Sequence, residues 1–525
     1  MALSETPMQR ERATTIYEKS KAGRRAAVLP DAEVPERPLE ELIPAELLRA
    51  APPRLPEVAE PEIVRHYNRL SRRNFDLDTG FYPLGSCTMK HNPRLNERVA
   101  ALPGHARLHP AQDPKRAQGA LELMWLLQES LAEICGLPHV SLQPSAGSHG
   151  ELAGLLLTRA YHADRGEERT KVLAPDTSHG TNPASVTMAG YEVVKVATNE
   201  RGGVEMDDLR AKIAEGPDQV ACLMLTNPNT LGLFDDNIAE IAGLIHAAGG
   251  TLYYDGANLN AVMGQSRPGD MGFDIVHVNL HKSFSQPHGG GGPGAGPIAV
   301  SERIEPFLPR PQVVRRFRQD AEPPWSERHE LMDSRAEQGE GRYFFDLDLE
   351  RPKSIGRLRG FQGNFGVFVR SYAYILSLGA DGLAEASETA VLNANYLKVR
   401  LAEGRAGERL PVAFDRHCMH EFVLSGKPMK KELGLATLDL AKRLLDFGFH
   451  PPTVYFPLLV EEALMIEPTE TETKESLDAF AEAVEGILAE AEDDPEIAKQ
   501  APYTTPVRRL DEVKATRKPV VRQPL

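Results

Sequence analysis

The sequence predicts an α/β protein with a large domain built on a mostly parallel β-sheet and a smaller α+β domain after it. Two patterns in the middle of the chain support this fold class. Strand-like segments recur with helical segments between them, and those strands are apolar along nearly their whole length. Near-continuous apolar strands joined by amphipathic helices are typical of a parallel sheet that is covered on both faces.

The individual elements follow from this alternation. Between the strands, residues 236–248 have isoleucines at 238, 241 and 245 on one helical face, and two glycines then end the predicted helix. The predicted strands are "KVLAP" from 171, "YEVVKVA" from 191, "VACLMLTNP" from 220, "TLYYDGA" from 251, "DIVHVNL" from 274 and "GPIAV" from 296.

Composition changes along the chain predict three parts. Residues 1–100 form an N-terminal arm with helices, because frequent prolines prevent long helices before a predicted helix at 62–73. Residues 101–380 form the large domain, with a polar, proline-interrupted surface excursion at 311–342. Residues 381–525 form the small domain, with strands expected at "LPVAFD" and "HEFVLSG". Its tail from Val507 carries six basic and two acidic residues, which suits either a solvated end or a docking strap.

The overall composition excludes several classes of protein. Seventy-five acidic against 60 basic residues give a net charge of -15, which argues against nucleic-acid binding. No apolar run approaches the roughly 18 residues of a membrane span, and the N-terminus lacks the apolar core of a secretory signal. Four widely spaced cysteines suit reduced thiols. We therefore expect a cytoplasmic protein that binds neither nucleic acid nor membrane.

Two charged residues stand where apolar strands end. Lys282 follows the strand "DIVHV", and Asp255 ends the strand "TLYYD". Ligands of α/β sheets bind beyond the carboxyl ends of the strands, and a buried carboxylate there requires a cation. Pyridoxal phosphate needs a lysine for a Schiff base, a carboxylate for its pyridine nitrogen and a cradle for its phosphate. Lys282 and Asp255 fit the first two needs.

The turn Ser145-Ala146-Gly147-Ser148 fits the third need. It follows a short strand that ends at Gln143 and precedes a helix that starts near His149, and a helix N-terminus favours an anion. His179, after the strand "KVLAP", is a candidate for stacking on the pyridine ring.

Each of these residues also has an ordinary explanation. A lysine after a strand is usually solvated, an aspartate there often caps a helix, and a lone histidine is more often structural. The cluster "HGGGGPGAGP" lacks the G-K-[ST] of a Walker loop. The pair in "HCMH" at 417–420 lacks helical metal-ligand spacing, so no metal site is expected. What favours pyridoxal phosphate is the occurrence of all four elements in a consistent order.

Longer blocks resemble a known family. "NLHKSFSQPHGGGGPGAGP", "DGANLNAVMG", "SHGTNPASVTMAGYEVV", "LTNPNTLGLFD" and "FYPLGSCTMKHNPRLNE" resemble the glycine-cleavage P-protein, glycine dehydrogenase (decarboxylating). "LMIEPTETETKESLDAF" and "APYTTPVRRLDEVKATRKPV" resemble the second subunit of its two-subunit form. The resemblance covers the chain from about residue 62 to its end. It implies a pyridoxal-phosphate-dependent transferase fold of type I, like that of aspartate aminotransferase.

The resemblance also implies roles for individual residues. Lys282 would form the Schiff base, Asp255 would pair with the pyridinium, and His179 would stack on the ring. Ala257 would bind the cofactor beside Asp255, and Asn227 would lie near the ring hydroxyl. His281 and the turn Ser145, Ala146, Gly147 and Ser148 would contact the phosphate, and which hydroxyl does so stays open.

The implied reaction is the decarboxylation of glycine with transfer of the aminomethyl group to the lipoyl cofactor of the H-protein. The implied partner is a homologous subunit 1, with two copies of each subunit. Glycines beside Lys282 would keep the approach of the lipoyl arm open, and Gly291→Val would test this. Two alternative hypotheses are that the chain is a related decarboxylase that needs no carrier protein, or that it is a non-catalytic scaffold subunit.

Two further residues have alternatives that the sequence leaves open. Cys87 in "PLGSCTMK" is either a small buried thiol or a redox-sensitive group near the site. Arg370 is either an anchor for the glycine carboxylate or a structural ion-pair partner.

Overall fold

The computed structural model describes residues 14–28, 30–31, 33–288, 294–318 and 342–522. Its contacts divide the chain into two compact units. One unit extends from Gly80 to Lys499, and the other combines the chain up to Thr79 with the chain from Gln500. All the predicted site residues belong to the first unit.

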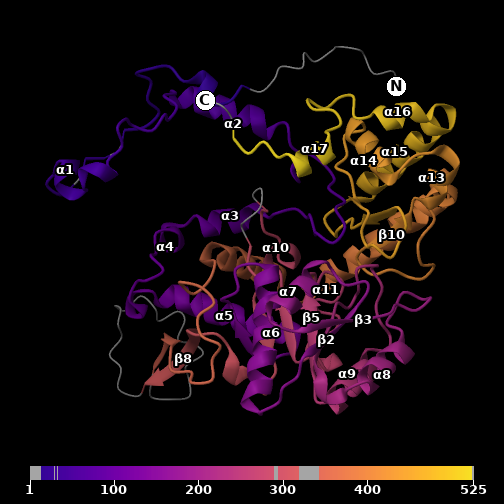
Figure 1. Ribbon diagram of the computed structural model, residues 1–525, viewed down its shortest axis with the longest axis horizontal. Coiled ribbons are helices and arrows are strands. Elements are labelled where there is room, and N and C mark those ends of the chain that lie inside the picture. The colour runs from indigo at the N-terminus through magenta and orange to yellow at the C-terminus, as the bar shows by residue number, and fades with distance from the viewer. Residues whose placement is uncertain (1–13, 29, 32, 289–293, 319–341, 523–525) are drawn as a thin grey trace. The chain divides into compact units, whose positions relative to one another are not determined.

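A seven-stranded sheet forms the centre of the first unit (Figure 1). The strand order is β1-β7-β6-β5-β4-β2-β3. Strands β3, β2, β4, β5 and β6 are parallel, and β7 is antiparallel to both β6 and β1. The strands are β1 His139–Ser141, β2 Lys171–Pro175, β3 Glu192–Val196, β4 Val220–Leu225, β5 Thr251–Gly256, β6 Ile275–Val278 and β7 Ile298–Val300. The prediction of a mostly parallel sheet is confirmed.

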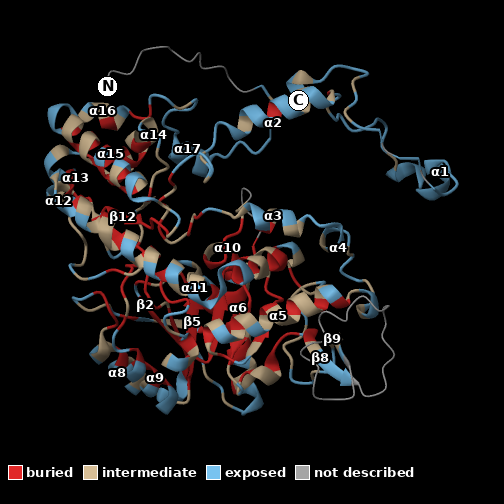
Figure 2. Ribbon diagram, turned by 180° about the vertical axis from the view of Figure 1, so that it is seen from behind, coloured by how far each residue is buried: buried red, intermediate tan, exposed pale blue. Residues whose placement is uncertain are grey.

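Helices cover both faces of this sheet, which explains why its central strands are apolar throughout (Figure 2). On β5, Tyr254 packs into a core with α5, α9 and α11, whereas its neighbour Tyr253 packs into a second core with α6 and α7. Both tyrosines are fully buried. The helices of this unit up to α11 are α3 Arg94–Ala100, α4 Pro103–Ala106, α5 Gln118–Cys135, α6 Gly147–Asp164, α7 Thr181–Met188, α8 Met206–Ala214, α9 Ile238–Ala247, α10 Leu280–Ser283 and α11 Phe365–Ala402.

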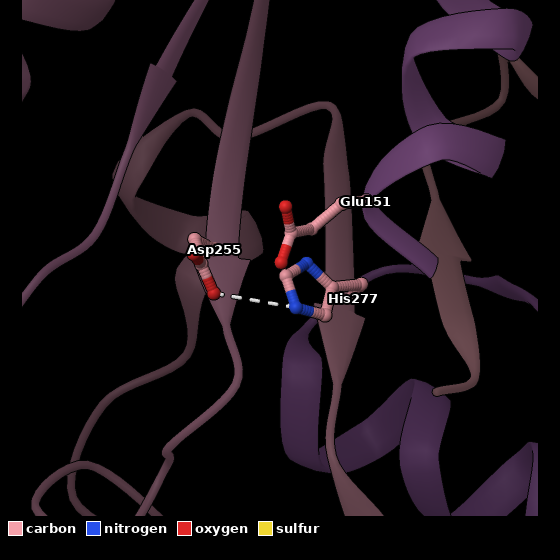
Figure 3. Close-up of side chains that lie close together, drawn as sticks. All are labelled: Glu151, Asp255 and His277. Carbon is pink, nitrogen blue, oxygen red and sulfur yellow. Dashed lines mark ion pairs between the residues drawn. The ribbon is translucent and has the colours of Figure 1, made fainter. Parts of the chain in front are cut away.

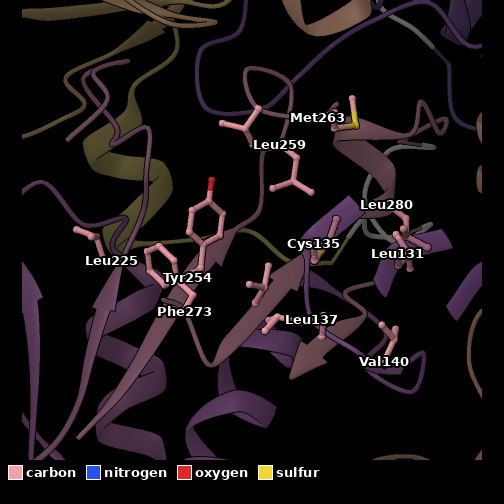
Figure 4. Packing of buried hydrophobic residues seen from close by; sticks show 14 of the residues in the cluster. Leu131, Cys135, Leu137, Val140, Leu225, Tyr254, Leu259, Met263, Phe273 and Leu280 are labelled. Atoms are coloured by element: carbon pink, nitrogen blue, oxygen red, sulfur yellow. The ribbon is translucent and has the colours of Figure 1, made fainter. Parts of the chain in front are cut away.

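The larger core holds the sheet against α5 (Figure 4). Leu131 and Cys135 of α5 are buried there, and Gly136 ends the helix in a left-handed conformation with φ 68°. The rings of Tyr254 and Phe273 pack edge to face with centroids 4.8 Å apart. Burial of each such side chain contributes about 1.5–3 kcal/mol to the free energy of folding, so packing on this face stabilises the sheet.

The predicted surface excursion begins and ends in strands that the sequence analysis did not predict. β8 (Gln312–Arg318) and β9 (Arg342–Asp348) pair antiparallel, and residues 319–341 between them lie outside the described residues. Gln118 of α5 holds β9 in place, because its side chain donates to Phe345 O at 2.7 Å and accepts from Phe345 N at 2.8 Å.

The C-terminal part of this unit has a separate antiparallel sheet, β10-β12-β11. The 38-residue helix α11 leads into it and is interrupted at Gly379, where φ is 66° and ψ is -173°. The division at residue 380 stays a prediction. The elements are α12 Arg405–Arg409, β10 Phe422–Ser425, α13 Lys427–Leu433, α14 Thr437–Asp446, β11 Thr453–Val454, β12 Ala463–Ile466, α15 Lys474–Asp493 and α16 Pro495–Gln500.

Of the two strands expected in this part, one is present. "HEFVLSG" contains β10, but "LPVAFD" forms only an isolated bridge between Val412 and Leu424. Pro411 lacks an N–H and so cannot extend the ladder in that direction.

The second unit contains short helices and little core. Its helices are α1 Leu39–Leu42, α2 Glu60–Ser71 and α17 Glu512–Arg517. Helix α2 lies where a helix was predicted, and Glu62 near its start binds Arg24. Among the described residues of the whole chain, no helix is long and apolar enough to span a membrane.

Candidate active site

The predicted site residues lie at one edge of the sheet. His179 follows β2, Asn227 follows β4, Asp255 lies near the end of β5, and Lys282 follows β6. These four strands are parallel neighbours in the order β6-β5-β4-β2, so their carboxyl ends meet at the same edge. The fold therefore brings together residues that are up to about a hundred positions apart in sequence.

Asp255 is 3% exposed and is held by several donors. Its Oδ1 accepts from Ala257 N at 3.0 Å and lies 3.3 Å from Nε2 of His277, and its Oδ2 accepts from Asn182 Nδ2 at 3.0 Å. Figure 3 shows Asp255, His277 and Glu151 converging from β5, β6 and α6. Burial opposes ionisation of this carboxyl, but His277, the donors and Lys282 outweigh it and hold the pKa of Asp255 below its ordinary value.

Glu151 and His277 were not predicted, and they connect Asp255 to the loop of His179. Glu151 accepts from Thr181 Oγ1 at 2.8 Å, and Thr181 Oγ1 lies 2.8 Å from Nδ1 of His179. His277 Nδ1 lies 2.9 Å from the hydroxyl of Tyr253. His179 itself is exposed, as a side chain that stacks on a ligand would be before the ligand binds.

Lys282 and His281 lie in the short helix α10. The Lys282 ammonium donates to Ser86 O at 2.6 Å, and its charge acts on Asp255. His281 has a buried Nδ1 with no hydrogen-bond partner among the described residues. Burial, and then the charge of Lys282, lowers the pKa of His281 to about 4, so its imidazole is neutral at pH 7.

The turn at residues 145–148 leads directly into α6. No side chain caps this 18-residue helix at Ala146, so its first-turn N–H groups are available to a ligand. Ser145 is partly engaged, because its N–H and Oγ lie 3.2 and 3.1 Å from Nδ1 of His149. Ser148 is exposed. A Cβ at Gly147 would lie 2.5 Å from Asn279 Oδ1, so any larger residue there would require the buried Asn279 side chain to shift.

The described end of the glycine cluster packs against this turn. A Cβ at Gly296 would lie 2.1 Å from Ala146 O, and Gly296 N donates to Pro144 O at 3.0 Å. Close backbone approach therefore explains this glycine. Residues 289–293, including Gly291, lie outside the described residues, so the idea that they leave room for a lipoyl arm stays a prediction.

An unpaired amide and a nearby cation fit an anionic aromatic ligand. Asn227 is fully buried, and its Nδ2 has no partner in the part of the chain that the structure describes, whereas its Oδ1 accepts from Asp235 N at 2.9 Å. Arg359 donates to Asn364 Oδ1 at 2.8 Å, and Asn364 donates to Ser145 O at 3.1 Å, which places a cation near the turn. Buried polar atoms are normally paired, so these groups fit a phosphate and a ring hydroxyl.

A second group of polar residues near Lys282 was missed. His420, Glu421 and Glu467 are each at most 3% exposed. A ring nitrogen of His420 and one carboxylate oxygen of each glutamate lie within 4.8 Å of one another. They come from the ends of strands β10 and β12 of the three-stranded antiparallel sheet. The sequence offered one signal: Glu467 follows the apolar strand "ALMI", as Asp255 ends an apolar strand.

The structure bears on the roles that the sequence left open for Arg370 and Cys87. Arg370 forms a two-pronged ion pair with Glu97, at 2.7 and 3.0 Å, which is the structural role. None of the four cysteines is in a disulfide. Cys87 is partly buried near Lys282, and burial raises its pKa.

The chain is similar to a known protein family, to individual related sequences and to solved structures. Residues 36–313 match the family model "Glycine cleavage system P-protein", and residues 386–505 match "Glycine dehydrogenase, C-terminal domain". A probable glycine dehydrogenase (decarboxylating) subunit 2 of Caldanaerobacter subterraneus is 54% identical over 516 residues, which cover 98% of this chain and 99% of that protein. Another, of Halalkalibacterium halodurans, is 55% identical over 508 residues and covers 97% of each.

Solved structures confirm the fold. A glycine decarboxylase (P-protein) in inhibitor-bound form superimposes with a TM-score of 0.68 at 22% identity, covering 85% of this chain and 94% of that one. A cysteine desulfurase from Escherichia coli superimposes with a TM-score of 0.57 at 15% identity, covering 79% and 95%.

The fold is the type I fold of pyridoxal-phosphate-dependent transferases, as the sequence analysis predicted. The identity to full-length relatives is specific enough to go further. The chain belongs to the glycine cleavage system P-protein family, among the glycine dehydrogenase (decarboxylating) subunits 2.

Proposed function

We propose that this chain is the catalytic subunit 2 of a glycine dehydrogenase. It decarboxylates glycine and transfers the aminomethyl group to the lipoyl cofactor of an H-protein, releasing CO2. The observation that carries this proposal is the convergence of Asp255, Lys282 and the uncapped start of α6 at one sheet edge, in a chain 54% identical to such subunits over nearly its whole length.

Pyridoxal phosphate is the cofactor that these residues fit. Lys282 would bind its aldehyde carbon, Asp255 its pyridine nitrogen, and His179 its ring face. The first turn of α6, from Gly147, would hold its phosphate with Ser145, Ser148 and neutral His281 nearby, and Asn227 Nδ2 would donate to its hydroxyl. When bound, this cofactor accepts the electron pair that decarboxylation leaves on carbon.

The chain's own residues prepare the site for this chemistry. Asp255 stays ionised despite its burial, because Asn182, Ala257 and His277 surround it. It can therefore keep a proton on a ring nitrogen placed against it. Glu151 fixes the loop of His179 through Thr181, which orients the ring face of that histidine. Both arrangements hold polar groups in fixed positions, which is how a site lowers the cost of reorganisation.

The partners belong to the same proposal. The names of the relatives denote a second subunit, so a homologous subunit 1 is the expected partner, in two copies with two of this chain. The lipoylated H-protein is the expected acceptor. A cytoplasmic location is supported by four unpaired cysteines, because thiols stay reduced there.

Borohydride reduction with peptide mass mapping tests the proposal. After incubation with pyridoxal phosphate, we expect one phosphopyridoxyl adduct, on Lys282. Lys282→Arg should lose the adduct, because a guanidinium does not form a stable imine. Lys398→Arg is the matched control, since Lys398 also donates to a backbone carbonyl, Arg416 O at 2.6 Å, but lies outside the site.

Glycine-dependent CO2 release then separates the proposal from its rivals. We expect release to require both subunit 1 and lipoylated H-protein. Equal release without the H-protein would indicate a carrier-independent decarboxylase. The absence of any Lys282 adduct, with subunit 1 present, would contradict the proposal altogether.

A further inference from the structure

A chain of hydrogen bonds links Lys282 to the small domain. Lys282 Nζ donates to Ser86 O at 2.6 Å, and Ser86 N donates to Glu421 Oε2 at 2.7 Å. Ser86 adopts a left-handed conformation, with φ 64°, which is costly for a non-glycine residue. The surrounding structure therefore holds Ser86 where both its N–H and its carbonyl oxygen are used.

Glu467 lies beside Glu421 and is only half satisfied. Its Oε1 accepts from Thr88 Oγ1 at 2.6 Å, Asn258 Nδ2 at 2.9 Å and Asn260 Nδ2 at 3.2 Å. Its Oε2 is buried and has no partner among the described residues. Three donors on one oxygen and none on the other leave the second oxygen free to bear or accept a proton.

The charges around the pair do not allow both carboxyls to ionise. Lys282 is the cation that acts on both. The next cation, Lys90, is already paired with Glu470 at 2.7 Å. Burial and then Lys282 lower the pKa of His420 to about 3, and burial raises that of Cys87, so both are neutral at pH 7. The single positive charge of Lys282 thus faces both glutamates as well as Asp255, and a buried pair of like charges retains one proton.

The titration of each glutamate agrees with this geometry. Burial, and then the charge of Glu467, raises the pKa of Glu421 to about 8. Burial also raises the pKa of Glu467. The shared proton is therefore present at pH 7 and is lost as the pH rises through about 8.

We infer that Glu421 and Glu467 together hold one exchangeable proton opposite Lys282, and that this proton goes to the sulfur that leaves the lipoyl disulfide. The second half of this inference rests on the proposed function. As glycine loses CO2, its carbon forms a bond to one lipoyl sulfur and the S–S bond breaks. The electron pair of that bond stays on the other sulfur, which takes the proton and becomes a thiol. Solvent returns one proton to the glutamate pair in each turnover.

Difference infrared spectroscopy tests the proton itself, without turnover. In the full chain assembled with subunit 1, we expect a carboxylic-acid carbonyl band that disappears as the pH rises through about 8. Glu421→Gln and Glu467→Gln should each remove it. Glu462→Gln is the matched control, because Glu462 is also buried in the small domain but is paired with Lys430, and its pKa is lowered by that contact and Thr437 despite burial. A band that survives in both test variants would overturn the inference.

A pH profile tests where the proton goes. In the wild type, H-protein-dependent CO2 release should fall as the pH rises through about 8. Glu421→Gln should lower this rate by about 100-fold, the lower end of the effect of a general acid, and should abolish the fall. Labelling of Lys282 and the thermal unfolding midpoint should stay at wild-type values.

The outcomes separate the two proposals. Wild-type rates and an unchanged pH profile in both glutamine variants, with Lys282 labelled, would refute the proton transfer and leave the proposed function intact. No Lys282 label in the wild type would refute the proposed function, and the infrared band would still decide whether the pair holds a proton.

Discussion

At the scale of single residues, Asp274 illustrates a carboxylate that serves the fold rather than the chemistry. It is 5% exposed, and its oxygens accept from Arg303 Nε at 2.6 Å and Leu252 N at 2.8 Å, with His246 Nε2 at 3.0 Å. We expect Asp274→Asn to lower the free energy of unfolding by about 3 kcal/mol at pH 7, because it removes the negative charge opposite the partly buried guanidinium of Arg303. Denaturant titration measures this, and folded protein should keep its activity.

The pH dependence of that loss has a definite sign. Burial opposes ionisation of Asp274, but His246, Arg303 and Leu252 outweigh it and lower the pKa below 3.8. Its contribution is therefore present above the unfolded pKa and lost as the pH falls through and below 3.8. The difference from Asp274→Asn should shrink over that range. Asp270→Asn is the control: its exposed pairing with Arg267 should contribute at most about 1 kcal/mol.

The same scale shows why some site residues were predictable and others were not. Lys282 and Asp255 follow apolar strands that are neighbours in a parallel sheet, so strand order alone brings them together. Glu421 precedes a short strand of a separate antiparallel sheet, and only packing of the small domain places it at Ser86. Glu151 lies inside a helix, where no local pattern distinguishes it from a surface residue. Tertiary contacts, absent from local sequence patterns, determine these positions.

At the scale of elements, α6 connects the core to the site. It packs on the sheet without room for larger side chains, because a Cβ at Gly154 would lie 2.0 Å from Cε2 of Tyr253. Tyr253 is fully buried and cannot move aside, since its hydroxyl donates to Gly150 O at 3.1 Å. The packing of this helix on the sheet therefore determines the position of its uncapped N-terminus.

We expect Gly154→Ala to destabilise the protein by about 1–3 kcal/mol through overpacking. This would exceed the gain of about 1 kcal/mol that alanine usually gives over glycine inside a helix. Gly243→Ala in α9 is the matched control, because no atom lies within 4 Å of its added Cβ, and it should stabilise the protein. Thermal unfolding of both variants measures the difference; equal gains would show that α6 has room to move.

The strands of the parallel sheet were easier to predict than the strands outside it. Periodicity identified the parallel strands because helices on both faces make them apolar throughout. It did not identify β8 and β9, because neither strand alternates strictly between apolar and polar residues: Arg315 and Arg316 are adjacent in β8, and Tyr343 to Phe345 are adjacent in β9. It overestimated "LPVAFD", where apolar residues suggested a strand but a single bridge forms.

At the scale of the whole molecule, the unit formed by the N-terminal arm and the C-terminal tail presents apolar side chains without burying them. Leu39, Leu47 and Leu55 are 60%, 71% and 69% exposed, and few residues of this unit are buried. A segment that exposes several apolar side chains and buries little core of its own fits binding to another chain. Because the relatives of this chain are subunits of a larger enzyme, we expect subunit 1 to cover it.

The triple variant Leu39→Ser, Leu47→Ser and Leu55→Ser tests this expectation. Burial of each leucine contributes about 1.5–3 kcal/mol, so losing three should weaken binding to subunit 1 by at least ~100-fold. Sedimentation of mixtures of the two subunits measures the affinity. Glu40→Ser, Glu46→Ser and Arg54→Ser change neighbouring polar residues and should leave it unchanged. Unaltered affinity in the leucine variant would show that the arm binds elsewhere, whereas a loss that spares Lys282 labelling would separate assembly from the site.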